Sequence, residues 1–180
     1  MKYTAQTKTR LYLAATASVT LSMIGCTTSG VQKEAQTDSR ACEAFKDVIS
    51  KSASNFDSLK QGAGVTDYDH TRWDTRAIFD GADCDVIGWG AGKTNYACTW
   101  TKPSADAARK DYQTTVTAVR SCLGASWSET AIPGVTGEGL RFSTKGSPSV
   151  VDLRMNKELA TSGNWLTSLT VGSPINRNAK

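Results

Sequence analysis

Residues 84–100 read CDVIGWGAGKTNYACTW, which places a glycine-rich turn between two strand-like runs. The runs span about residues 84–89 and 95–100, and the turn is residues 90–94. In an antiparallel hairpin centred on Ala91, Cys84 and Cys98 lie directly opposite each other, within reach of a disulfide. We therefore predict a hairpin over this segment, closed by a Cys84–Cys98 disulfide.

Two helical patterns stand on either side of this hairpin. Before it, apolar residues recur every three or four positions and predict a helix over about residues 39–60, begun by Asp38 as N-cap and ended by Gly62 and Gly64. After it, a second predicted helix starts at Ser104 and runs to about Leu123. The apolar faces comprise Cys42, Phe45, Ile49, Ser52, Phe56 and Leu59 in the first helix, and Ala105, Ala108, Tyr112, Thr115, Val116, Val119 and Cys122 in the second.

The four cysteines of the domain allow three disulfide connectivities. With Cys84 joined to Cys98, Cys42 near the start of the first helix meets Cys122 at the end of the second, provided that the helices pack antiparallel. A zinc site is the competing interpretation, but no Cys-x-x-Cys pair occurs in the sequence. We therefore predict two disulfides, Cys84–Cys98 and Cys42–Cys122.

Alternating apolar and polar residues predict further strands at about 73–79, 140–144, 151–156 and 165–171. The order is then helix, three strands, helix, and three or four strands, with short connections that favour antiparallel pairing. These elements predict a single small α+β domain over residues 38–180, with an antiparallel sheet, both helices packed on one of its faces, and two disulfides.

The N-terminus has the three parts of an export signal. Lys2, Lys8 and Arg10 precede a mildly apolar stretch over residues 11–25, which is short for a membrane span and ends at Cys26. The residues before that cysteine are Met23-Ile24-Gly25, so this segment resembles the lipobox of bacterial lipoproteins, with Met in place of the usual Leu. The resemblance covers residues 1–26 only.

This resemblance implies a signal peptide over residues 1–25, palmitate or another acyl chain on Cys26, and a membrane anchor. Residues 26–37 are polar and are predicted to form a lipidated, flexible stalk. Thr27 stands where an Asp signals inner-membrane retention in Gram-negative lipoproteins. The expected location is therefore the outer membrane if the organism is Gram-negative, with the domain in the periplasm or beyond, and otherwise the extracytoplasmic face of the cell membrane.

The charge balance does not favour nucleic-acid binding. The chain has 21 basic and 17 acidic residues, but residues 1–25 hold three of the basic ones and none of the acidic ones, so the remainder is nearly neutral. A nucleic-acid-binding domain usually has a strongly basic stripe or face. The expected partners are the membrane, through lipid on Cys26, and a protein of the envelope.

The sequence offers no residue that we assign to catalysis and no cofactor. Gly92-Lys93-Thr94 is reminiscent of a phosphate-binding loop, but Ile87 stands where such a loop requires its first glycine. His70 is the only histidine, it lies in a polar segment, and no Gly-x-Ser-x-Gly motif accompanies it. Carboxylates alone suffice for glycoside hydrolysis, so a hydrolase of wall or lipid stays an alternative.

Two features suggest binding. Trp89 lies beside the glycine-rich turn and Trp127 near Gly124, and exposed tryptophans often anchor protein interfaces. Acidic residues gather over residues 67–85 and could bind a small ligand or a metal ion such as calcium, although their spacing does not match an EF-hand. These acids are Asp67, Asp69, Asp74, Asp80, Asp83 and Asp85.

Taken together, these patterns favour a membrane-anchored, non-enzymatic envelope lipoprotein that binds another macromolecule. It would act as an accessory subunit of an envelope assembly, or as an inhibitor or immunity-type protein. The alternatives are a small-ligand or metal-ion binder that uses residues 67–85, and the carboxylate-only hydrolase.

Lipidation can be tested directly at Cys26. Because the thiol of this residue is the expected acylation site, radiolabelled palmitate should enter the wild-type chain and should be lost from Cys26→Ala. Cys98→Ala is the matched control and should keep the label. Equal labelling of the wild type and Cys26→Ala would show that the lipobox resemblance is misleading.

Overall fold

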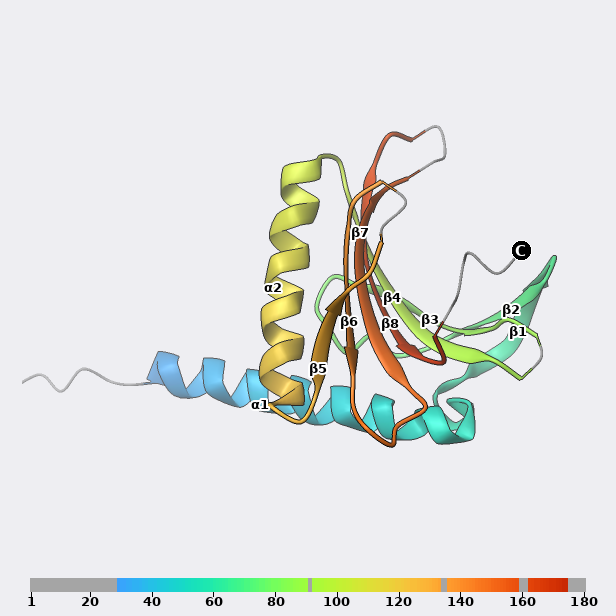
Figure 1. Ribbon diagram of the computed structural model, residues 1–180, viewed down its shortest axis with the longest axis horizontal. Coiled ribbons are helices and arrows are strands. Elements are labelled where there is room, and N and C mark those ends of the chain that lie inside the picture. The colour runs from blue at the N-terminus through green and yellow to red at the C-terminus, as the bar shows by residue number, and fades with distance from the viewer. Residues whose placement is uncertain (1–28, 91, 134–135, 159–161, 175–180) are drawn as a thin grey trace, which may run out of the picture.

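The computed structural model describes residues 29–90, 92–133, 136–158 and 162–174 (Figure 1). Within these residues two α-helices accompany one eight-stranded antiparallel sheet, with the strand order β1-β2-β3-β4-β8-β7-β6-β5. The helices are α1 (Ser29–Lys51) and α2 (Ala105–Leu123). The strands are β1 (Gln61–Asp67), β2 (His70–Asp74), β3 (Asp83–Gly88), β4 (Thr94–Lys102), β5 (Ser128–Ala131), β6 (Glu138–Ser143), β7 (Val150–Lys157) and β8 (Trp165–Gly172). The chain is thus an α+β fold, as predicted.

The two halves of the chain have the same order of elements. Each half is a helix followed by four strands that pair in sequence, and the last strand of each half lies at the centre of the sheet. There β4 and β8 pair antiparallel over eight residue pairs, from Asn95 opposite Gly172 to Lys102 opposite Trp165. This central pairing joins the two halves into one sheet and one domain.

Helix α2 follows the prediction closely. The side chain of Ser104 accepts a hydrogen bond from the backbone N–H of Ala107 (3.3 Å), and the helix ends at Gly124, whose φ is 72°. Its buried residues are Ala108, Tyr112, Thr115, Val116, Val119, Cys122 and Leu123.

Helix α1 differs from the prediction at both ends. It begins at Ser29, inside the segment predicted to be a flexible stalk, because a polar segment rich in Gln, Lys, Glu and Ala has good intrinsic helix propensity. It ends at Lys51 instead of near Lys60, because Asn55 and Phe56 adopt left-handed backbone conformations (φ 54° and 59°). Two short 3₁₀ turns, Ser52–Ser54 and Asp57–Leu59, replace its last predicted turns.

The strand predicted over residues 73–79 is also corrected. Strand β2 ends at Asp74, and the next residues form a loop whose backbone accepts hydrogen bonds from the core. The Tyr96 hydroxyl donates to the carbonyl of Arg76 (2.7 Å), and the Trp100 indole N–H donates to that of Asp80 (3.1 Å). The preceding strand, β1, was missed because Gly62 and Gly64 suggest only a break.

Glycine is required at Gly64. Its φ is 72°, and a Cβ there would overlap the indole ring of Trp73, which also stacks under the Lys60 ammonium at 4.4 Å. The close approach of β1 to this ring therefore explains a glycine inside a strand.

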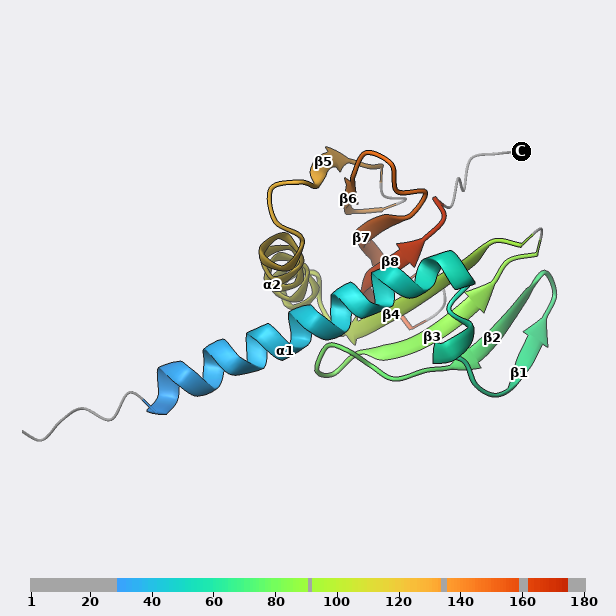
Figure 2. The same cartoon turned by 90° about the horizontal axis from the view of Figure 1, so that it is seen from below.

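Both predicted disulfides are confirmed. Cys84 and Cys98 face each other across β3 and β4, with their Cα atoms 4.1 Å apart, which is the predicted hairpin register. Cys42 of α1 and Cys122 of α2 are joined with their Cα atoms 5.0 Å apart. The second disulfide fixes α1 against α2, and the two helices cross on the same side of the sheet (Figure 2).

The core lies between the helices and that face of the sheet. Side chains alternate along each strand, so every second residue of β4 and β8 faces the helices and is buried. The fully buried core includes Phe45, Phe56, Val86, Tyr96, Val119, Phe142, Leu153 and Leu169.

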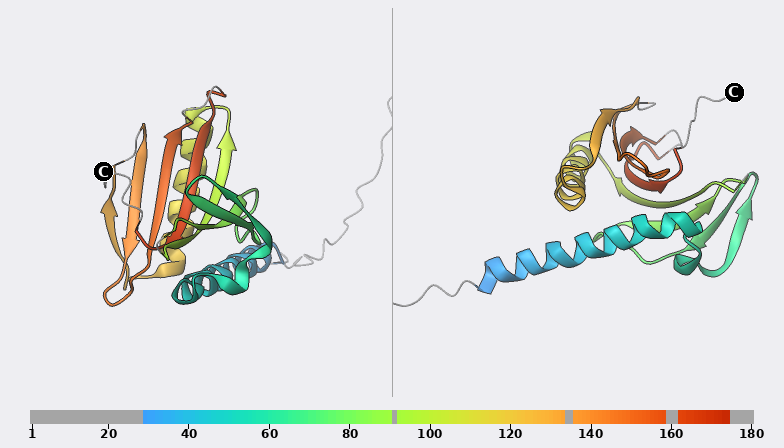
Figure 3. Two further views of the ribbon diagram at one scale, coloured as in Figure 1. Left: turned by 90° about the vertical axis from the view of Figure 1, so that its right-hand side faces the viewer. Right: turned by 60° about the horizontal axis from the view of Figure 1, so that its bottom comes forward.

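Neither helix covers the opposite face, which we call the open face. Figure 3 (left) shows the β1–β2 hairpin standing in front of it, so the open face curves inward.

Tyr96 provides a test of this core through pH. Burial raises the pKa of Tyr96 to about 12, above its ordinary value of 10.0, so the unfolded state ionises first as the pH rises. The stability that Tyr96 contributes is therefore complete below pH 10 and is lost as the pH rises through 12. Tyr96→Phe should lower the unfolding free energy by about 1 kcal/mol at pH 8, because its hydrogen bond is lost.

Urea unfolding at several pH values measures both effects. The difference between the wild type and Tyr96→Phe should shrink above pH 10, while the exposed control Tyr68→Phe should track the wild type throughout. A difference that stays constant up to pH 11.5 would contradict the assignment of Tyr96 as a buried, neutral donor.

Candidate functional site

The open face is polar and its charges are unevenly placed. Strand register puts Asp74, Asp85 and Arg72 on the β2–β3 side, and Arg141, Asp152 and Arg154 on the β6–β7 side. Between them the β4 and β8 strands present uncharged Thr99, Ser168 and Thr170. The face therefore has an acidic wing, a neutral floor and a wing in which arginine predominates.

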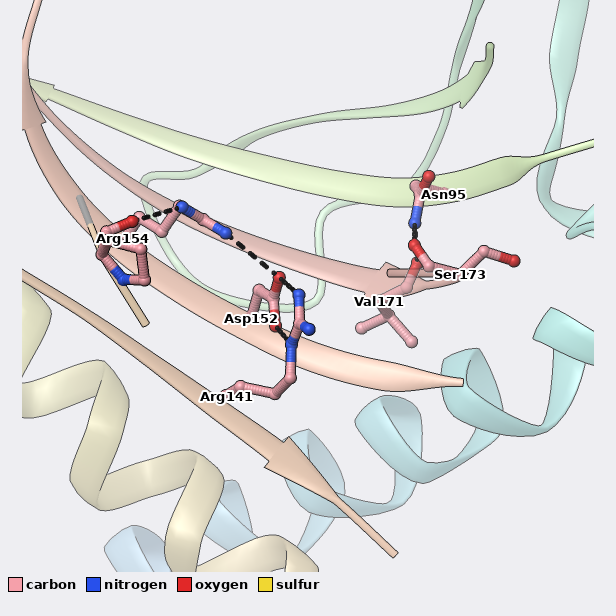
Figure 4. Close-up of polar contacts among 7 residues, drawn as sticks. Asn95, Arg141, Asp152, Arg154, Val171 and Ser173 are labelled. Carbon is pink, nitrogen blue, oxygen red and sulfur yellow. Dashed lines mark hydrogen bonds and ion pairs between the residues drawn. The ribbon is translucent and has the colours of Figure 1, made fainter. Parts of the chain in front are cut away.

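An ionic network forms the second wing (Figure 4). Arg141 donates two hydrogen bonds to Asp152, Nε to Oδ1 and Nη2 to Oδ2, both at 2.7 Å. The Arg154 guanidinium lies 3.5 Å from the same Oδ2 and donates to the carbonyl of Pro133 at 2.9 Å. The Asp152 side chain is only 8% exposed, and those of Arg154 and Arg141 are 16% and 23% exposed.

This network is electrostatically unbalanced. The hydrogen bonds to Asp152 raise the pKa of Arg141, which opposes the effect of burial. Both oxygens of Asp152 are engaged by Arg141, so Arg154 shares a carboxylate that is already paired. Two guanidinium groups and one carboxylate leave one positive charge in excess at a largely buried position.

A shallow polar hollow adjoins the network. Its wall includes Asn95, Asp152, Arg154, Ser168, Thr170 and Ser173. Asn95 is 1% exposed and donates to the carbonyl of Ser173 at 2.9 Å, while its Oδ1 has no hydrogen-bond partner among the described residues. Gly172 permits this arrangement, because a Cβ there would overlap the Asn95 side chain.

A second feature lies at the tips of two hairpins that share one end of the sheet. We call it the aromatic rim, and it comprises Val65, Tyr68, His70 and Trp89. Tyr68 is 98% exposed and Val65 is 73% exposed; they are the two large hydrophobic residues that stand out as exposed in the described chain. The His70 and Trp89 rings lie 5.3 Å apart, and His70 Nδ1 lies 3.1 Å from Asp69.

Tyr68 has an unfavourable backbone. Its φ is 48°, in the left-handed region that most residues avoid and that Gly or Asn adopts at little cost. Trp89 is also unusual, since its indole N–H is buried and has no acceptor among the described residues. The two-residue turn between β1 and β2 sets the φ of Tyr68, but it does not require an aromatic side chain there.

The tryptophans divide into two groups. Trp100 is buried in the core, and Trp73, Trp127 and Trp165 are partly buried and pack against it. Trp89 is half-buried and is not part of that cluster. Of the two tryptophans that the sequence suggested as anchors, Trp89 therefore lies at the rim, whereas Trp127 packs against the core. Cys26 lies outside the described residues.

The acidic segment 67–85 is spread over β1, β2, β3 and their loops. Asp85 pairs with Arg72 at 2.7 Å, and Asp69 contacts His70. In the part of the chain that the structure describes, no three His, Cys, Asp or Glu side chains gather in a metal-binding arrangement. Over the same residues no helix is long and apolar enough to cross a membrane.

The chain was compared with known protein families, curated proteins and solved structures, and none of them matches it.

Sequence reasoning missed Tyr68 and the network around Asp152. The alternation in 140–144 and 151–156 does place Arg141, Asp152 and Arg154 on one face, but it does not show which residues pair across the strands. The register Arg141 opposite Asp152 depends on the turn between β6 and β7. For Tyr68, a large aromatic residue between Asp67 and Asp69 was the available signal, because a turn there normally favours small residues.

Proposed function

We propose that this chain is a non-enzymatic, membrane-anchored envelope protein that binds another macromolecule through its open face and aromatic rim. The observation that carries the proposal is Tyr68, which is 98% exposed at the tip of a hairpin in a left-handed conformation. A two-residue hairpin turn requires a positive φ at its first central residue, which Gly usually supplies, and a fully exposed aromatic ring at that position contributes little to folding. We therefore relate the ring to contact with a partner.

The rim has the composition of an interaction hot spot. Tyr and Trp supply a large apolar area with few rotatable bonds, so their burial by a partner costs little side-chain entropy. Val65 lies on the open-face side of β1, opposite Arg72, and Trp89 immediately follows β3, the strand next to the β4 strand of the polar floor. An apolar contact flanked by polar groups is the usual anatomy of a protein interface.

The position of the rim supports a partner that lies away from the membrane. Helix α1 has 23 residues and is about 35 Å long, and its first half extends beyond the rest of the domain (Figure 1). The rim lies at the opposite end of the molecule from the start of α1. If Cys26 is lipidated, the anchor is three residues before α1, and the rim points away from the lipid.

The state of the most buried carboxylate also supports binding over hydrolysis. A general acid or base must be able to exchange its proton with substrate. Asp152 instead accepts two short hydrogen bonds from Arg141 and has a second guanidinium beside it. Both of its oxygens therefore belong to a structural ion pair.

Tyr68→Gly separates binding from stability. The substitution removes the ring and relieves the positive φ, so the unfolding free energy should stay the same or rise by up to about 1 kcal/mol. Binding should nevertheless fall by tenfold or more if the ring is a hot spot. The measurements are thermal unfolding of the purified chain and its quantitative recovery of bound envelope proteins, identified by mass spectrometry.

Gln113→Ala is the matched control, because Gln113 is exposed on α2, away from the rim. It should retain the same bound proteins as the wild type. If Tyr68→Gly and Trp89→Ala both recover those proteins at wild-type levels, the rim is not the binding surface.

A further inference from the structure

We propose that the polar hollow binds a carboxylate group of the partner, either an Asp or Glu side chain or a C-terminus, with Arg154 as the main donor. This inference rests on the proposed function, because it specifies the chemistry of the same open face. It identifies a site, a ligand class and the residues that recognise it.

The positive charge of Arg154 calls for an anion. An arginine stays protonated at any pH at which the protein is folded, so a partly buried guanidinium needs a compensating anion. Among the described residues, several other arginine and lysine side chains have an acid of their own, as in Arg120 with Glu129 at 2.6 Å and Lys102 with Asp111 at 2.8 Å, and Arg109 contacts both Asp106 and Glu138. Only 16% of the Arg154 side chain is exposed, and the nearest carboxylate is the one that Arg141 already holds.

The wall of the hollow also supplies hydrogen-bond donors. Arg154 has five N–H groups, and among the described residues its hydrogen bond to Pro133 and its contact with Asp152 leave several of them without an acceptor. Ser168 and Thr170 lie on the same wall, and among the described residues their hydroxyls have no hydrogen-bond partner. A guanidinium beside two hydroxyls offers the donors that a planar carboxylate accepts.

The charges in the wall of the hollow favour a carboxylate over other anions. Asp152 forms part of the same wall, so a doubly charged phosphate would meet a carboxylate as well as Arg154. A carboxylate has one negative charge and matches the single positive charge in excess. A neutral sugar could use the hydroxyls but would leave that charge uncompensated.

The hollow is also well placed for a ligand that belongs to a macromolecule. Asn95 is the second residue of β4, and Trp89 immediately follows β3 in the same hairpin. Ser173 follows β8 at that end of the sheet, where Gly172 pairs with Asn95. A partner that contacts the aromatic rim can therefore place an acidic group in the hollow.

The test uses acetate as the probe and needs no partner. The full chain, labelled with ¹⁵N and purified in detergent micelles, is titrated with sodium acetate, sodium phosphate or sodium chloride at constant pH and ionic strength. Acetate should produce saturable shifts of the backbone amides of Asp152, Ser168, Thr170 and Ser173. Chloride should produce none, and phosphate should bind more weakly than acetate.

Variants identify the donor. Arg154→Gln should weaken acetate binding by about tenfold to a hundredfold, as expected for loss of a charged hydrogen-bond donor. Thr170→Val leaves every charged group in place and should weaken binding by a smaller factor. Arg109→Gln on α2 is the matched control and should bind acetate like the wild type.

The proposal is overturned if acetate causes no saturable shift, if Arg154→Gln and Thr170→Val both bind acetate normally, or if phosphate and chloride act as acetate does. These outcomes are distinct from failure of the proposed function. If acetate binds normally but substitutions in the rim leave partner recovery unchanged, the hollow is a binding site and the rim is not. If acetate does not bind but substitutions in the rim reduce partner recovery, the rim is a binding surface and the hollow is not a carboxylate site.

Discussion

The pairing of β4 with β8 is the constraint on which the rest of the structure depends. Each half of the chain is a helix with four strands, and neither half contains a second layer that could bury both faces of its strands. The two final strands, β4 and β8, pair over eight residue pairs. Their apolar side chains therefore lie on the same face of the sheet, with Tyr96 opposite Val171 and Cys98 opposite Leu169. Both helices then cover that face, and the Cys42–Cys122 disulfide holds α1 against α2.

An antiparallel sheet with helices on one side leaves its other face to be stabilised by polar contacts. Here that face contains the Arg141–Asp152–Arg154 network and the Arg72–Asp85 pair. Breaking a buried ion pair costs more than the pair contributes to stability, so the network fixes the geometry of β6 and β7 more than it strengthens the fold. The excess positive charge and the exposed ring of Tyr68 have no evident benefit for stability, and both lie on this face or at its edge. We therefore relate them to binding.

The sequence predicted those elements whose evidence is local. Helix α2 has a cap, a periodic apolar face and a terminal glycine, and the β3–β4 hairpin has two cysteines at matching distances from its turn. Elements that depend on distant contacts were predicted less well. Strand β2 ends at Asp74 because Tyr96 and Trp100 bond the backbone of the following loop, and β1 contains glycines because Trp73 packs against Gly64. Predicting the hollow would have required the register between three strands. The alternation of apolar and polar residues within each strand does not specify that register.

The most direct test of the central claim is site-specific photo-crosslinking in living cells. Benzoylphenylalanine would be placed at position 97, on the open-face side of β4, or at position 89 in the aromatic rim, just after β3. A third position, 110, lies on the exposed surface of α2. The account predicts that positions 89 and 97 form the same crosslinked adduct, and that position 110 does not form it. An adduct from position 110 without one from 89 or 97 would show that the partner binds the helices, and would contradict the account.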